Sequence, residues 1–217
     1  VGYLDDVTLG GLIQDVHSDV EIVRREAHLI GLDLNPIKCE VVSNMDDSDF
    51  GGKAFSDFSR VDWDDADLLS SPLTAGRQQN KILEKKCSDL TIAMSRLHLL
   101  DSHYALSIIS HCISAPKLLY TLRTSCCFDD NLLARFDIIV REGLGTVLNV
   151  QLTDVQWLQA SLPVREGGLG VRSVVSLAPS AFLASAVRTR ALQDQILPSC
   201  LPDLHFDSCV NLWSELS

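Results

Sequence analysis

The sequence predicts an α+β protein that is predominantly α-helical. It is expected to begin with a small unit of β-hairpin, helix and strand and to continue as an all-α module. In the first 45 residues, short apolar runs flank an acidic turn, and a helix-like stretch and another apolar run follow. After residue 73, apolar residues recur at spacings of three and four, the period of a helix with one buried face. With 217 residues, 46% of them hydrophobic, the chain has enough apolar material for one ordinary domain or two small ones.

The first expected element is a β-hairpin. Val1–Tyr3 and Val7–Leu9 are short apolar runs, and they flank Leu4-Asp5-Asp6. This pattern is typical of two strands joined by a tight turn with acidic residues at its tip. Gly10 and Gly11 then end the second strand.

A helix and a third strand complete the first 45 residues. Apolar side chains repeat at helical spacing from residue 12 to residue 30, and Gly31 follows as a C-cap. The repeating positions are Leu12, Ile13, Val16, Val20, Val23, Ala27 and Ile30. Leu34-Asn35-Pro36 predicts a turn, and Cys39-Glu40-Val41-Val42 predicts a strand that can return to the hairpin.

An acidic linker is expected over residues 46–67. The formal net charge of −11 arises wholly in residues 1–67, which hold sixteen acidic and five basic residues. Half of these acids lie in residues 46–67, among glycines and serines, where no helix or strand period is sustained. The rest of the chain is electrically balanced, so the acidic total excludes no binding surface there.

Residues 74–217 are expected to form a helical module, after a short apolar segment at residues 68–73. The predicted helices are Gln78–Leu100, Ser102–Ser114, Pro116–Thr124, Asn131–Leu148, Thr153–Ala160 and Pro179–Leu197. Pro116, Pro163 and Pro179 are placed near helix starts or breaks, because a proline has no N–H to donate inside a helix.

The cysteines indicate an intracellular protein of the cytoplasm or nucleus that is not secreted. There are seven, an odd number with no CxxC pair, and no secretory leader precedes them. The longest nearly uncharged stretch, Ala105 to Ala115, is too short to span a bilayer, so no membrane is expected as a partner. Because the chain starts with Val1 in an apolar segment, we expect it to begin inside a larger protein.

Tyr3-Leu4-Asp5-Asp6 is the strongest candidate for chemistry. Two adjacent carboxylates at a strand-turn-strand corner can both reach a hard cation, because the turn breaks the alternation of side chains. With a further carboxylate they would hold the paired ions that activate a 3′-hydroxyl and stabilise pyrophosphate. As a bare dipeptide, Asp-Asp carries little information and is more typical of a polar turn.

The order of the boxes along the chain resembles the palm of reverse transcriptases, specifically those of non-LTR retrotransposons. In that family a YxDD box on a hairpin is followed by a helix and by a GLxLNxxKxE box, here Gly31 to Glu40. Residues 68–73 resemble the next box, which begins the primer-grip hairpin, with Ser70 in place of its usual glycine. Residues 160–172, with Leu162-Pro163 and Gly167-Gly168-Leu169-Gly170, resemble a segment downstream of the same polymerase domain. The four boxes cover most of residues 1–172.

The resemblance implies roles for five residues. Asp5 and Asp6 would be catalytic metal ligands for two Mg²⁺ ions, with Mn²⁺ as an alternative, and Asp5 would be the principal ligand. Tyr3 and Leu4 would lie at the primer end and the nucleotide. Lys38 would contact the phosphates of the incoming nucleotide or donate a proton to pyrophosphate, where its charge is electrostatically favourable.

The resemblance also implies partners: an RNA template, a DNA primer and deoxynucleoside triphosphates. Residues 1–45 would be the C-terminal part of a palm, and residues 74–217 would be thumb-like. Basic side chains of the helical module would face the duplex: Lys81, Lys85, Lys86, Lys117, Arg123, Arg135 and Arg141. The family places a further catalytic aspartate upstream of YxDD, so the isolated chain is expected to be inactive. The alternative is a decayed or repurposed element whose helices form a non-catalytic interaction module.

Overall fold

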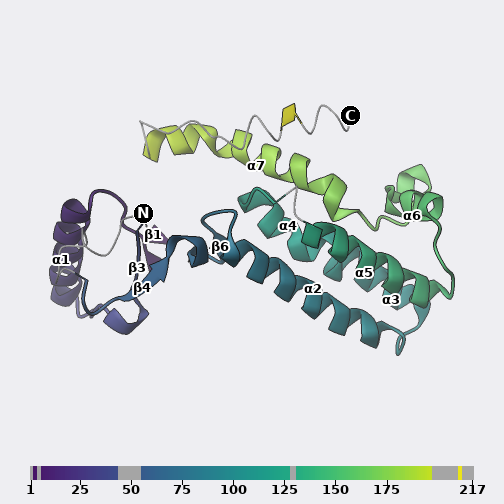
Figure 1. Cartoon of the computed structure of the whole chain (residues 1–217), viewed down its shortest axis with the longest axis horizontal. Coiled ribbons are helices and arrows are strands. Elements are labelled where there is room, and N and C mark those ends of the chain that lie inside the picture. Colours follow the sequence, from purple (N-terminus) through teal and green to yellow (C-terminus); the bar gives the residue numbers. More distant parts are fainter. Residues whose placement is uncertain (1, 4–5, 44–54, 128–130, 197–209, 212–217) are drawn as a thin grey trace. The chain divides into compact units, whose positions relative to one another are not determined.

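The computed structural model describes residues 2–3, 6–43, 55–127, 131–196 and 210–211 (Figure 1). The chain divides into two compact units, Val1–Ala66 and Asp67–Ser217. The first unit contains short strands and one long helix, and the second is mostly helical. The α+β, predominantly α fold class is therefore confirmed.

The first unit begins with the expected hairpin. Strands β1 (Gly2–Tyr3) and β2 (Asp6–Val7) pair antiparallel, with Tyr3 opposite Asp6. Helix α1 (Ile13–Leu29) follows, and Gly31 has the left-handed φ of 80° that was expected of a C-cap glycine. The amide N–H of Leu32 donates to the Ala27 carbonyl at 2.9 Å, which satisfies a carbonyl at the helix end.

The third strand does not return to the hairpin, and this expectation was wrong. Strand β3 (Glu40–Ser43) pairs in parallel with β4 (Ser59–Asp62), in a register that places Val42 opposite Val61. The second half of the expected linker is therefore regular: β4 is followed by a 3₁₀ turn at Trp63–Asp65. The backbone N–H and C=O groups of β3 need hydrogen-bond partners. The Ser59–Asp62 segment supplies them, although its sequence shows no sustained strand period. Residues 46–54 of the expected linker lie outside the described residues.

The second unit opens with a hairpin of β5 (Asp67–Leu68) and β6 (Ser71–Pro72), followed by the helices. The helices are α2 (Arg77–Leu97), α3 (Ser102–Ile108), α4 (Ala115–Thr124), α5 (Asn131–Leu148), α6 (Asp154–Ser161) and α7 (Val174–Ile196). The expected helices are thus present, and that over Asn131–Leu148 has the expected bounds. A π-helical turn, Ile109–Ile113, continues α3.

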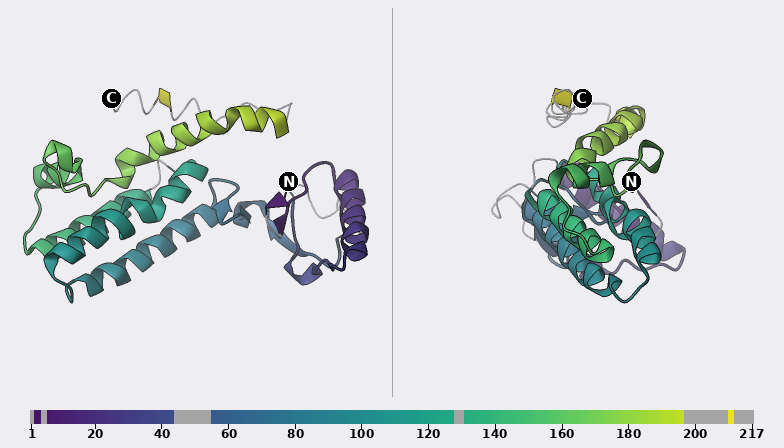
Figure 2. Two further views of the ribbon diagram at one scale, coloured as in Figure 1. Left: turned by 180° about the vertical axis from the view of Figure 1, so that it is seen from behind. Right: turned by 90° about the vertical axis from the view of Figure 1, so that its right-hand side faces the viewer.

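One apolar core holds these helices together. Helix α2 packs along α5, and α4 packs along α7, as both views in Figure 2 show. The fully buried side chains include Leu83, Leu90, Ile109, Leu118, Leu122, Leu133, Phe136, Val140 and Leu144. These positions recur at spacings of three, four and seven within their helices, so the periodicity correctly identified the core.

One stretch of the second unit passes a length and hydropathy test for a membrane span. Residues Ser102–Thr124 have a mean hydropathy of 1.2 over the best window. Several of these side chains, among them Ala105, Ile109 and Leu118, are fully buried in the core. A core helix passes the same test, so the stretch is weak evidence for a membrane span.

Helix α7 begins five residues before the position expected from Pro179. Pro179 lies inside the helix and is buried, although it was expected near the helix start. The earlier start has a tertiary cause: the side chain of Asp137, from α5, accepts hydrogen bonds from the amides of Val174 and Val175. These are N–H groups that a helix leaves without partners at its N-terminus.

Candidate metal and nucleic-acid site

The YxDD hairpin places two of its four residues opposite each other. Tyr3 pairs with Asp6 across β1 and β2, and the Asp6 residue is exposed. Leu4 and Asp5, which join the two strands, lie outside the described residues. The structure therefore describes one of the two expected metal ligands.

The donor chemistry at this hairpin fits a divalent cation. Asp6 offers an exposed carboxylate next in sequence to Asp5, and oxygen donors of this kind are those that Mg²⁺ prefers. Among the residues that the structure describes, no three His, Cys, Asp or Glu side chains are grouped to hold a metal ion. Asp6 thus needs further ligands to complete a site.

Lys38 is presented by a capped turn. Residues Pro36–Lys38 form a 3₁₀ turn, and the Asn35 side chain accepts a hydrogen bond from the Ile37 amide at 3.2 Å. The Lys38 amide donates to the Asn35 carbonyl at 3.1 Å. Asn35 and Pro36 therefore fix the backbone that carries Lys38 into β3, and the lysine is exposed. Among the described residues, no ion pair joins Lys38 to Asp6.

The β5–β6 hairpin, where the resemblance places the primer-grip remnant, has a strained turn. Leu68 pairs with Ser71, so Leu69 and Ser70 form a two-residue loop, and their φ angles are 52° and 63°. Positive φ at both central residues is the signature of a type I′ turn, which favours glycine or asparagine. A left-handed conformation costs an ordinary residue about 1–2 kcal/mol. Ser70 therefore occupies a position where glycine fits better.

The helices of the second unit hold this hairpin in place. The Tyr120 hydroxyl on α4 donates to the Leu69 carbonyl at 2.7 Å. The hydroxyls of Ser71 and Ser125 lie 3.2 Å apart, and the Gln78 side chain donates to Asp67 at 2.7 Å. Strand β5 is therefore hydrogen-bonded to α2, and the turn is hydrogen-bonded to α4. Strand β6 is hydrogen-bonded to Ser125, the residue that follows α4.

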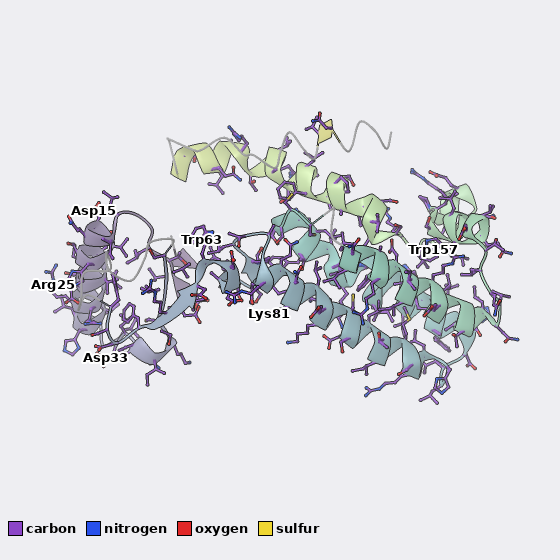
Figure 3. All side chains as sticks on the ribbon, in the orientation of Figure 1. Asp15, Arg25, Asp33, Trp63, Lys81 and Trp157 are labelled. Atoms are coloured by element: carbon purple, nitrogen blue, oxygen red, sulfur yellow. The ribbon has the colours of Figure 1, made fainter. Side chains whose placement is uncertain are left out.

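Arg141 and Lys117, both expected to face a duplex, make structural contacts within the helical unit. Arg141 donates to the Asp154 carboxylate at 2.7 Å and to the Leu152 carbonyl, which ties α5 to the start of α6. Lys117 lies 4.0 Å from Asp89 and links α4 to α2. Lys81 and Lys85 lie one turn apart on the outer face of α2 and are exposed (Figure 3 labels Lys81).

The glycine-rich segment at residues 167–170 has a structural explanation. Gly167 and Gly170 have φ angles of 83° and 71°, and a Cβ on Gly168 would lie 2.7 Å from the Gln159 carbonyl oxygen. The Leu169 amide donates to the Ala160 carbonyl at 3.0 Å. The segment therefore folds back over the end of α6, as a tight turn before the last helix.

A buried carboxylate was missed at the sequence level. Asp137 is only 8% exposed; it accepts from the Ser173 hydroxyl at 2.6 Å and from the Val174 amide at 2.8 Å. Burial raises the pKa of the Asp137 carboxyl, and these hydrogen bonds oppose the rise. The sequence contains one sign that Asp137 is buried. It lies on the apolar face of the predicted helix, together with Phe136, Val140 and Leu144.

Comparison of the chain with protein-family models, curated proteins and solved structures finds no match.

Proposed function

We propose that this chain is part of an RNA-directed DNA polymerase of the non-LTR retrotransposon type. In the complete protein, a nucleotide would be transferred to a primer 3′-hydroxyl on an RNA template by a two-metal mechanism. The observation that carries the proposal is the order of the boxes in their structural settings. A hairpin that pairs Tyr3 with Asp6 is followed by α1, by a capped turn that presents Lys38, and by a second, strained hairpin.

Asp5 and Asp6 would hold the metal ions in this proposal, together with the further aspartate that the family resemblance implies. The ions, when bound, would lower the pKa of the attacking hydroxyl and neutralise charge on the leaving pyrophosphate. Lys38 would add a positive charge near the nucleotide phosphates, and Tyr3 with Leu4 would support the primer end. The exposure of Asp6 and Lys38 is compatible with these roles, since both side chains must reach ligands from solvent.

The second unit would act as the thumb-like part that contacts the duplex. Its β5–β6 hairpin has the turn geometry of a glycine-containing box and is bonded to α4, while Lys81 and Lys85 offer exposed charge on α2. Contacts to phosphates need positive charge and little order, so binding to a template–primer duplex should be salt-sensitive.

A non-catalytic interaction module is the second candidate function. It is favoured by the apolar side chains around α6, because Val155, Leu158 and Val164 are each more than half exposed. Such side chains on a helix end are typical of a surface that contacts a protein.

Primer extension tests the polymerase proposal. A longer polypeptide that joins these residues to the upstream palm strand should extend a DNA primer on an RNA template when Mg²⁺ is present. Replacing Asp5 by Asn should lower the rate by about 10³-fold, since metal stabilisation of the transition state amounts to several kcal/mol. The exposed Asp154→Asn variant is the matched control and should keep the rate. Unchanged extension by the Asp5 variant would refute the assignment, and extension by residues 1–217 alone would refute the expectation that this part is inactive.

A further inference from the structure

Helix α6 has an apolar face that is turned away from the core. Val155 is 75% exposed and Leu158 is 65% exposed, whereas Trp157 and Ala160 pack against the core (Figure 3 labels Trp157). Because successive residues are rotated by about 100°, Val155, Leu158 and Leu162 lie within about 60° of one another around the helix axis. Trp157 and Ala160 lie on the opposite side. The exposed side chains therefore form one continuous strip, and such a strip is typical of a surface that contacts a protein.

The turn after α6 adds a further exposed apolar side chain and holds it in place. Val164 is 73% exposed and lies in the 3₁₀ turn that follows the helix. This turn is tied back to α6, because the Leu169 amide donates to the Ala160 carbonyl at 3.0 Å. We call the four exposed apolar residues the α6 stripe: Val155, Leu158, Leu162 and Val164. Since its backbone is fixed by hydrogen bonds, covering the stripe costs little conformational entropy.

A groove lies beside the start of α6. It has a volume of about 780 Å³, and its apolar lining comes from Ile138, Val150 and Leu152. Arg141 also lines the groove and donates to the Asp154 carboxylate at 2.7 Å, so the groove and the first residue of α6 are neighbours. The α6 stripe thus has an apolar hollow near one end and the exposed Val164 at the other.

The two ends of the stripe also carry opposite charges. The Asp154 side chain at the start of α6 is 95% exposed, and that of Arg165, next to Val164, is 84% exposed. Each already has a partner in its own chain, Arg141 or Glu166, but a carboxylate and a guanidinium both have further hydrogen-bonding positions. A surface with an acid at one end and a base at the other is complementary to a second copy of itself that runs antiparallel, which is the arrangement around a two-fold axis.

We infer that the α6 stripe is a self-association surface: two copies of this chain pack antiparallel along α6, with Leu158 near the two-fold axis. Asp154 of each copy then faces Arg165 of the other, and Val164 of each copy enters the other copy's groove. A second copy is thus the partner of the interaction surface given above as the second candidate function, on which this inference rests, and it does not depend on the polymerase proposal. One short helix and one turn bury less than the roughly 800 Å² per partner of a stable dimer, so dimerisation should occur at about 10–100 μM.

Sedimentation equilibrium of the full 217-residue chain from about 1 μM to about 1 mM tests the self-association. A reducing agent is present because Cys112 is exposed and free. The wild type should pass from monomer to dimer in this range. Leu158→Asp should weaken dimerisation about tenfold or more, because it places a charge at the centre of the apolar contact. Ile92→Asp is the matched control, since Ile92 on α2 is also about half exposed, and it should leave dimerisation unchanged.

Two outcomes of this experiment would overturn the inference: a wild type that stays monomeric throughout the range, or Leu158→Asp that dimerises as tightly as the wild type. A monomeric wild type would leave the second candidate function standing, with a different protein as the partner to seek. Primer extension would still decide the polymerase proposal.

Charge reversal tests the antiparallel arrangement. Asp154→Lys and Arg165→Glu each place like charges opposite each other at both ends, so each variant alone should dimerise about fivefold more weakly at low salt. An equimolar mixture of the two variants should regain the wild-type affinity, because both ends of the mixed dimer then pair opposite charges. Mixing cannot repair a variant that is merely misfolded. A mixture that associates no better than either variant alone would overturn the inference.

Discussion

The start of helix α7 is predicted to depend on one buried carboxylate, that of Asp137 on α5. Its two oxygens accept from the Ser173 hydroxyl at 2.6 Å, the Val174 amide at 2.8 Å and the Val175 amide at 3.3 Å. The perturbations are Asp137→Ala, which removes all three acceptor contacts, and Asp137→Asn, which keeps the size of the side chain. Both leave the apolar side chains of the core in place.

The magnitude follows from these contacts. Hydrogen bonds to a charged acceptor contribute about 1.5–3 kcal/mol each, and a carboxylate near a helix N-terminus adds about 0.3–2 kcal/mol. The cost of burying the charge offsets part of this, but Val174 is fully buried and its amide would be left without an acceptor. We expect Asp137→Ala to lower the free energy of unfolding by about 3 kcal/mol. Asp137→Asn should lower it by about 2 kcal/mol, because its amide group turns a donor toward other donors.

Urea denaturation of the full chain, followed by the helical circular dichroism signal, measures these changes. Asp154→Asn is the matched control, since Asp154 also lies at a helix start but its side chain is 95% exposed. It should change the free energy of unfolding by less than about 1 kcal/mol. If Asp137→Asn costs no more than Asp154→Asn, the carboxylate does not hold the start of α7 and the reasoning is wrong.

The pH dependence gives a second check on Asp137. Because burial raises its folded-state pKa above the usual 3.8, the folded chain binds a proton more tightly than the unfolded chain does. The stability of the wild type relative to Asp137→Asn should therefore rise as the pH falls through the folded pKa toward about 4, and should fall as the pH returns to about 7. The opposite trend would mean that the hydrogen bonds outweigh burial.

Three other perturbations test separate parts of the structure. Ser70→Gly should raise the free energy of unfolding by about 0.5–1 kcal/mol in urea denaturation, because glycine adopts the positive φ of this position without strain and costs little extra entropy. A loss of stability would contradict the type I′ turn. Gly168→Ala should lower it by about 1–3 kcal/mol, because the new Cβ meets backbone oxygens that cannot move away easily; an unchanged thermal midpoint would contradict this packing. Replacing Lys81 and Lys85 by Glu should weaken template–primer binding about tenfold or more at low salt in an anisotropy titration. Arg165→Glu is the control. An equal loss of affinity in both variants would indicate a general charge effect and contradict a binding surface on α2.

Much of the helical unit was predictable because its information is local. The spacing of apolar residues identified the six helices, and for Asn131–Leu148 it gave the bounds found in the structure. Gly31 was recognised as a C-cap because glycine accepts the left-handed conformation that ends a helix. The candidate site was predicted in the same way, from residue types and their order, and the roles of Asp5, Asp6 and Lys38 remain predictions.

The remaining features depend on partners distant in sequence. By itself the sequence determined where helices form and which faces are apolar, since helix periodicity is a property of neighbouring residues. Only the tertiary structure decided that β3 pairs with β4, that α7 starts at Val174, and that the Leu69–Ser70 turn is bonded to α4. Each of these is set by backbone groups that must find a hydrogen-bond partner, and the nearest suitable partner comes from another element: β4, Asp137 or Tyr120.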